Sequence, residues 1–181
     1  MPAAEFNCDA QQQPSWHDRA RVAAALLEHV VPRRGAPVVV LDIGCGDMKL
    51  LQQLRAAGSA AHYQGLDLHP QAAQVLPYDV RTQPLPQPCD AAVLLGVVEY
   101  LEAPAEVLRR LARETRYLVA SHVVSDNAGY DAAQLRRLNW KTHMTRGDFA
   151  ALLAGCGFEV LREATTANRK TVLWLCAAPA R

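Results

Sequence analysis

Acidic residues and glycines follow three apolar runs in the first half of the chain. Asp42 precedes Gly44 and Gly46 in the stretch VVVLDIGCGDMKLL, Asp67 lies in GLDL and Asp79 lies in YDV. Glycine lets a ligand approach the backbone closely, and a loop that enters a helix presents free N–H groups. A carboxylate at position 42 would repel a pyrophosphate. These residues therefore predict a site for a ligand with cationic or hydrogen-donating groups.

The glycine spacing disfavours two common nucleotide-binding loops. A dinucleotide loop needs glycine at positions 44, 46 and 49, and position 49 is lysine. A phosphate-binding P-loop needs Ser or Thr after its lysine, and Lys49 is followed by Leu50. The acidic residue two positions before Gly44 is the feature that remains to be explained.

Polar and aromatic residues in the second half of the chain are candidates for chemistry. Glu99, Tyr100, His122 and His143 are possible proton acceptors, and Trp140 offers a flat apolar wall for a small substrate. Each residue also has a purely structural interpretation. A single histidine is more often a structural hydrogen-bonding group, Glu99 and Tyr100 suit the start of a helical turn, and Trp140 suits the core. The sequence leaves both interpretations open.

Alternating strand and helix patterns predict how these residues are positioned. The predicted strands span residues 36–44, 61–68, 73–80, 89–98, 115–123, 158–166 and 170–178. Predicted helices begin at a Ser15–Asp18 capping box, at residue 47, at Pro104 and at a Thr145–Asp148 capping box. The segment 123–143 has no clear pattern. The result is an α/β fold with a seven-stranded, mostly parallel sheet and helices on both faces. The last strand should be antiparallel, because the connection before it is too short for a parallel crossover. We expect a flexible arm at 1–14 and one domain at 15–181.

Taken together, these motifs resemble the class I S-adenosylmethionine-dependent methyltransferases over roughly residues 15–178. The first motif of that family is an acidic residue followed by Gly-x-Gly-x-Gly, and here Met48 replaces the third glycine. GVVEYL is similar to the family segment GVLEHL, and HMTRGDFAALLAGCGFEV is similar to its closing helix and strand. The resemblance implies a Rossmann-like fold and S-adenosylmethionine as cofactor. It assigns the ribose hydroxyls to Asp67 and the adenine amino group to Asp79. The cofactor-contacting residues that it implies are Asp42, Gly44, Cys45, Gly46, Asp67, Leu68, Asp79, Val80 and Gly96.

The expected function is methyl transfer to an oxygen or nitrogen of a small molecule. The chain has no separate substrate domain, and we take His143, Tyr100 and His122 as catalytic candidates. No metal is expected: Asp126-Asn127 resembles part of the metal site of catechol-type relatives, but position 96 lacks its acidic partner. The alternatives are a non-catalytic methyltransferase-like binding module and, more remotely, a nicotinamide-dependent oxidoreductase.

The residue type at position 48 also leads to an expectation about stability. Replacing Met48 by glycine is expected to lower the stability of the fold somewhat, because glycine loses more backbone entropy on folding.

Composition sets the expected partners and location. The chain has 181 residues and a net charge of +1, so no general attraction to nucleic acid or membranes is expected. Five cysteines without CxxC spacing indicate reduced thiols and a cytoplasmic protein. We therefore expect a small-molecule partner, no nucleic acid and no membrane. The sequence does not indicate the oligomeric state.

Overall fold

The computed structural model describes residues 14–31, 38–127 and 129–180. The helices are α1 (Pro14–Leu27), α2 (Lys49–Ala56), α3 (Pro104–Glu114), α4 (Ala132–Arg137) and α5 (Arg146–Gly155), and η2 (Val98–Tyr100) is a 3-10 turn. The strands are β1 (Val39–Ile43), β2 (His62–Asp67), β3 (Leu76–Pro77), β4 (Ala91–Leu94), β5 (Tyr117–Val123), β6 (Glu159–Thr165) and β7 (Thr171–Ala177). The expected arm lies outside the described residues, apart from Pro14, with which α1 begins.

The strands form one sheet in the order β3-β2-β1-β4-β5-β7-β6. The pairs β2–β3, β1–β2, β1–β4 and β4–β5 are parallel, and β7 is antiparallel to both β5 and β6. This confirms the predicted α/β fold with a seven-stranded, mostly parallel sheet and an antiparallel last strand.

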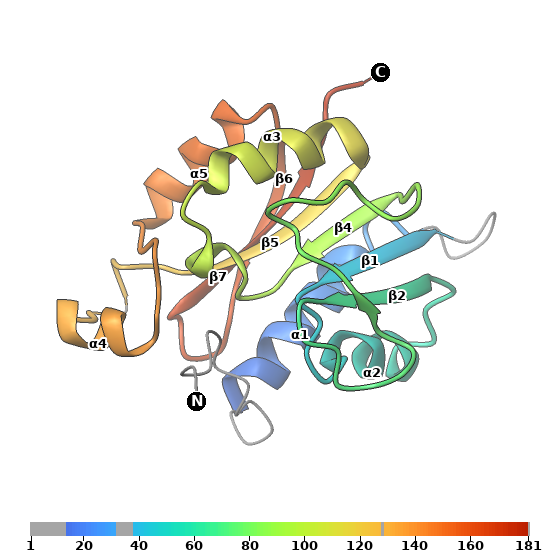
Figure 1. The fold of residues 1–181 in the computed structure, drawn as a ribbon, viewed down its shortest axis with the longest axis horizontal. Helices are drawn as coiled ribbons and strands as arrows, with labels where there is room; N and C mark the ends of the chain where they lie inside the picture. The colour runs from blue at the N-terminus through green and yellow to red at the C-terminus, as the bar shows by residue number, and fades with distance from the viewer. Residues whose placement is uncertain (1–13, 32–37, 128, 181) are drawn as a thin grey trace.

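Helices cover both faces of the sheet, α1 and α2 on one and α3 and α5 on the other (Figure 1). Successive residues of a strand point to opposite faces, so Val40 of β1 packs with Leu27 of α1 and Leu54 of α2. The next residue, Leu41, packs with Leu111 of α3. The sheet is thus buried on both sides, as its continuous apolar runs predict.

Two predicted element boundaries were wrong. Helix α1 begins at Pro14 rather than after a Ser15 cap, and Asp18 instead pairs with Arg21 and accepts a hydrogen bond from the backbone of Ala167 at 2.6 Å. Proline is tolerated in the first helical turn, where its missing N–H would have no partner. The third strand is only two residues long and ends at Pro77, which cannot donate to a sheet ladder. The predicted Thr145 cap is confirmed, since Oγ1 accepts from the N–H of Asp148 at 3.0 Å.

The unpatterned segment contains α4, which stands beside the end of β5 and away from the helical layers (Figure 1). No residue of α4 is buried, and the side chain of Asp131 caps its start. The carboxyl ends of β1, β2, β4 and β5 meet at the same edge of the sheet. Ligands of open α/β sheets bind at this edge.

Candidate active site

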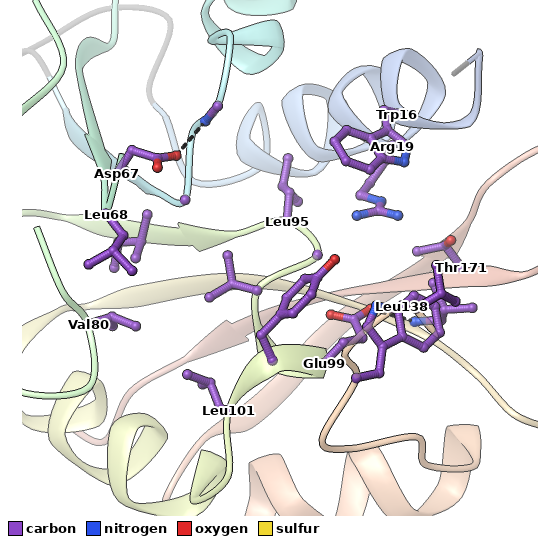
Figure 2. Close-up of a pocket in the computed structure, with 18 of the residues that line it drawn as sticks. Trp16, Arg19, Asp67, Leu68, Val80, Leu95, Glu99, Leu101, Leu138 and Thr171 are labelled. Atoms are coloured by element: carbon purple, nitrogen blue, oxygen red, sulfur yellow. Dashed lines mark hydrogen bonds between the residues drawn. The ribbon is translucent and has the colours of Figure 1, made fainter. Parts of the chain in front are cut away.

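A cavity of about 450 Å³ opens at the carboxyl ends of the parallel strands. Its size is within the range that is usual for small-molecule sites. Asp67, Leu68 and Val80 line one end, and Arg19 and Glu99 lie at the other end (Figure 2). The cavity therefore has two ends lined by different residues, and each end can hold a different part of a bound ligand pair.

The loop after β1 takes its shape from three left-handed residues at alternate positions. Gly44, Gly46 and Met48 have φ values of 72°, 51° and 60°. An added Cβ at Gly44 would lie 2.5 Å from Cγ2 of Val97, so this position also has no room for a side chain. Met48 thus adopts the backbone conformation that the third glycine of the motif would adopt without strain. It does not line the cavity.

Met48→Gly should therefore raise the free energy of unfolding by about 1 kcal/mol, because it removes a left-handed non-glycine residue. For a domain of this size that is roughly 2–4 °C in melting temperature. This reverses the expectation from the sequence, which assumed an ordinary φ at position 48. Gln52→Gly, at an exposed position within α2, is the matched control and should cost about 1 kcal/mol. A melting temperature of Met48→Gly below that of the unmodified protein would contradict the account.

Asp67, at the end of β2, faces the cavity and organises the loop. Its Oδ2 accepts a hydrogen bond from the N–H of Gly46 at 2.8 Å, and its Oδ1 accepts from the N–H of His69 at 2.9 Å. A carboxylate oxygen accepts more than one hydrogen bond, so both oxygens can also receive a vicinal diol. Gly44, Gly46 and Asp67 all line the cavity, as the sequence predicts.

Asp42 and Cys45 lie behind the loop and do not line the cavity. Asp42 is only 2% exposed and accepts a hydrogen bond from the hydroxyl of Tyr63 at 2.7 Å. Burial raises the pKa of its carboxyl to about 7, the hydrogen bond from Tyr63 opposes this, and the nearby charge of Asp67 adds to it. Cys45 is buried, and its N–H bonds the carbonyl of Leu66 at 3.1 Å. The expectation that Asp42 contacts the cofactor directly is corrected: its position within the buried part of β1 turns it toward Tyr63.

The end of the cavity beyond Asp67 suits a flat ring. Leu68 and Val80 contribute apolar walls, and Asp79 also lines it. The two oxygens of Asp79 are held by Nε and Nη2 of Arg81 at 2.9 and 3.0 Å. This hydrogen-bonded pair lowers the pKa of Asp79. A donor from a ligand would share this carboxylate with Arg81.

Glu99, in η2, lines the other end of the cavity and has one carboxylate oxygen that is unpaired within the described ranges. Its Oε1 accepts from the N–H of Val123 at 3.0 Å, whereas the buried Oε2 has no hydrogen-bond partner among the residues that the structure describes. Its backbone carbonyl accepts from the N–H groups of Lys141 and Thr142 at 2.7 and 3.1 Å, which fixes the segment that carries Trp140. Glu99, Tyr100, Trp140 and Gly96 all line the cavity.

The two histidines lie outside this cavity lining. His122 is fully buried, stacks on Phe149 with ring centroids 4.8 Å apart, and accepts a hydrogen bond at Nε2 from the N–H of Met144 at 3.0 Å. Its Nδ1 lies 3.7 Å from Oε1 of Glu99. Burial lowers the pKa of His122, and Glu99 opposes that shift. The placement of His122 at the pocket is therefore corrected: it supports Glu99 from behind. His143 packs against Trp140 at 5.9 Å between ring centroids and is also absent from the lining.

Arg19, which α1 places in the cavity, was not among the site residues predicted from the sequence. It is 9% exposed, and its Nε has no hydrogen-bond partner within the described residues. Its guanidinium lies 5.8 Å from the ring centroid of Trp16. Burial lowers the pKa of Arg19, and the charge of Glu99 opposes that shift. An added Cβ at Gly96 would lie 2.1 Å from Nη1 of Arg19, so glycine at position 96 makes room for this side chain. An arginine within a mostly apolar helix face was the available signal.

The described ranges lack two features that would indicate other functions. None of the helices there is long and apolar enough to cross a membrane. No three His, Cys, Asp or Glu side chains in those ranges are grouped so that they could hold a metal ion. Asp126, which matches part of the metal-binding motif of catechol-type methyltransferases, accepts a hydrogen bond from the N–H of Arg146 at 2.7 Å.

Solved structures with the same fold are distant in sequence. The partner of the Haloferax volcanii Trm112 methyltransferase activator, in their solved complex, is 16% identical, with a TM-score of 0.75 over 96% of this chain and 93% of its own. Magnesium protoporphyrin IX methyltransferase from Synechocystis, solved with bound S-adenosylhomocysteine, is 19% identical, with a TM-score of 0.67 over 91% and 84%. The [4+2]-cyclase SpnF is 16% identical, with a TM-score of 0.68 over 90% and 81%. At these identities the likeness shows the fold alone.

The sequence itself provides the stronger comparison. No curated protein matches the chain. Residues 15–163 match a family profile described as "Methyltransferase domain", which covers most of the chain and includes the loop after β1, Asp67 and Glu99. The protein therefore belongs to the class I S-adenosylmethionine-dependent methyltransferases.

Proposed function

We propose that the protein transfers a methyl group from S-adenosylmethionine to a hydroxyl or amine of a small molecule. The adenosyl half of the cofactor occupies the end of the cavity at Asp67 and Val80, and the acceptor occupies the end at Glu99, Tyr100 and Trp140. The observation that carries the proposal is the buried, unpartnered Oε2 of Glu99 in this second half. A carboxylate there can accept a proton or a hydrogen bond from the nucleophile as it attacks.

The rest of the mechanism is positioning. Methyl transfer from a sulfonium is an in-line displacement, in which the nucleophile forms a bond to the methyl carbon as the carbon–sulfur bond breaks. The protein must hold the reacting atoms about 3–3.5 Å apart and keep water away. Tyr100 and Trp140 are half-buried and wall this part of the cavity. His122 acts as a positioning residue through Glu99, and His143 acts through Trp140.

Asp67 provides the first test of the cofactor position. Asp67→Ala should weaken the binding of S-adenosylmethionine by at least about tenfold, since two hydrogen bonds to the ribose are lost at about 1 kcal/mol each. Calorimetric titration of both proteins measures the change. Asp126→Asn, at the same edge of the sheet but outside the cavity lining, is the control and should bind as the unmodified protein does. If Asp67→Ala binds S-adenosylmethionine as tightly as the unmodified protein does, the assignment of the ribose to Asp67 is wrong.

A labelled extract tests the activity and the acceptor class together. The protein is incubated with a cell extract and S-adenosylmethionine that carries a deuterated methyl group. Mass spectrometry then follows the label in small molecules, protein and nucleic acid. The proposal expects the label in a small molecule. Label only in macromolecules would contradict the small acceptor, and no label with intact cofactor binding would favour the non-catalytic module. SpnF shares the fold and is named as a [4+2]-cyclase, so the fold alone does not establish methyl transfer and the labelling experiment is needed.

The nicotinamide alternative makes a separate prediction about binding. If the protein is a methyltransferase, NAD⁺ should show no binding at concentrations that saturate the protein with S-adenosylmethionine. The cytoplasmic location remains part of the proposal, and the four described cysteines, all free thiols, support it.

A further inference from the structure

The acceptor half of the cavity carries an excess of positive charge. Arg19 of α1, Arg137 at the end of α4 and Lys170 before β7 line the cavity together with Glu99. Within the described residues, none of these three cations has a carboxylate within 4.0 Å. Asp67 and Asp79 line the other half, and Arg81, which also lines it, is paired with Asp79. The two halves of the cavity therefore differ in sign.

Arg19 is the cation for which burial is most costly. A buried charge without a partner is strongly disfavoured, and burial lowers the pKa of Arg19 as this cost requires. The side chain points from α1 into the cavity on the side of Glu99 (Figure 2). Trp16 lies against its guanidinium, and Gly96 leaves space for it. A guanidinium with an unpartnered Nε is suited to a bidentate bond with a carboxylate.

Aromatic side chains surround this cation. The chain contains three tryptophans and five tyrosines, and Trp16, Trp140, Tyr100 and Tyr130 line the same cavity. The rings of Tyr130 and Trp140 pack edge to face with centroids 5.3 Å apart. Such rings favour stacking with a flat ligand.

We propose that the acceptor is an aromatic compound with an acidic group, whose carboxylate pairs with Arg19 while its hydroxyl or amine faces Glu99. This inference rests on the proposed function and names the substrate class for the same site. Arg137 and Lys170, at the exposed rim, attract the anion toward the cavity, and Arg19 binds it inside.

Binding to the cofactor-loaded protein tests the inference without any need for turnover. The protein is saturated with S-adenosylhomocysteine and titrated by calorimetry with two matched pairs of probes. The pairs are 4-hydroxybenzoate with 4-hydroxybenzamide and 1-hydroxy-2-naphthoate with its amide. In at least one pair, the acid should bind tenfold or more tightly than the amide. Equal affinity of acid and amide in both pairs would overturn the inference.

Variants of α1 identify the residue that is responsible. Arg19→Gln should reduce the preference for the acid to less than about twofold, and Arg19→Lys should keep part of it. Arg21→Gln is the matched control, because Arg21 lies on the same helix, is exposed and does not line the cavity. A preference that persists in Arg19→Gln would overturn the role of Arg19. Arg19→Gln should fold, since it removes a buried charge, and its melting temperature should be no lower than that of the unmodified protein.

A second set of titrations tests whether the carboxylate that pairs with Arg19 belongs to the acceptor or to the cofactor. S-adenosylhomocysteine has a carboxylate, and 5′-methylthioadenosine does not. If Arg19 binds the acceptor, Arg19→Gln should change the affinity of both by less than about threefold. A tenfold loss for S-adenosylhomocysteine alone would assign Arg19 to the cofactor and overturn the inference. Failure of the proposed function appears differently, as absence of methyl transfer in the labelled extract.

Discussion

Glu99→Gln should lower the rate of methyl transfer by about 100-fold or more, because general base catalysis contributes this much when the nucleophile carries a proton. The substitution keeps the shape of the side chain, and its amide oxygen can still accept the hydrogen bond from Val123 that Oε1 accepts now. What is lost is the negative charge and the proton-accepting lone pair of the unpartnered Oε2. The affinity for S-adenosylmethionine should change by less than about threefold, because the cofactor is held at Asp67.

The control for this experiment lies three residues away. Glu102 is exposed and does not line the main cavity, so Glu102→Gln should retain the full rate. Single-turnover measurements at saturating cofactor isolate the chemical step. A rate in Glu99→Gln above about half of the normal value would show that Glu99 only holds Val123 and the segment at Trp140.

Asp42→Asn should make the protein more stable at pH 8 and leave its stability at pH 4 unchanged. The pKa of Asp42 is raised to about 7 in the folded state, mainly by burial, whereas an unfolded aspartate titrates near 3.9. Between these values the folded protein binds a proton that the unfolded chain has released. Stability is therefore lost as the pH rises toward 7, by roughly 1.4 kcal/mol per pH unit and up to about 4 kcal/mol in total.

Asparagine keeps an oxygen that can accept the hydrogen bond from Tyr63 and has no proton to lose. Urea unfolding of both proteins from pH 4 to pH 8 measures the difference between their free energies of unfolding. The titration of the other groups is the same in both proteins and cancels in this difference. The groups around Asp42 that also carry charge or protons are Asp67, Tyr63 and Cys45, and all three are kept. Equal pH dependence in the two proteins would mean that Asp42 is ionised at neutral pH.

The cofactor half of the site was predictable from the sequence because it depends on local patterns. Gly44 and Gly46 were recognised by their spacing, and the structure gives both a positive φ. Asp67 was recognised because it ends a strand that leads to the same edge of the sheet, and it lines the cavity. The order of strands and helices followed from periodicity in the same way.

The acceptor half was less predictable because it depends on tertiary packing. A strand-end position suggested that His122 faces the ligand, but Phe149 and Met144 from distant parts of the chain enclose it. Arg19 comes from a helix that precedes the sheet, and only the packing of α1 against the strand ends brings it to Glu99. The backbone conformation of Met48 was also not predictable, because methionine as a residue type does not indicate a φ of 60°.

The most direct measurement is the crystal structure of the complex with S-adenosylhomocysteine. We expect the ribose hydroxyls to bond the carboxylate of Asp67 and the sulfur to lie within about 8 Å of Oε2 of Glu99. This separation leaves room for a methyl group and one nucleophile at near-contact distances. A sulfur more than about 10 Å from Glu99, or a ribose away from Asp67, would contradict the assignment of the two halves of the cavity.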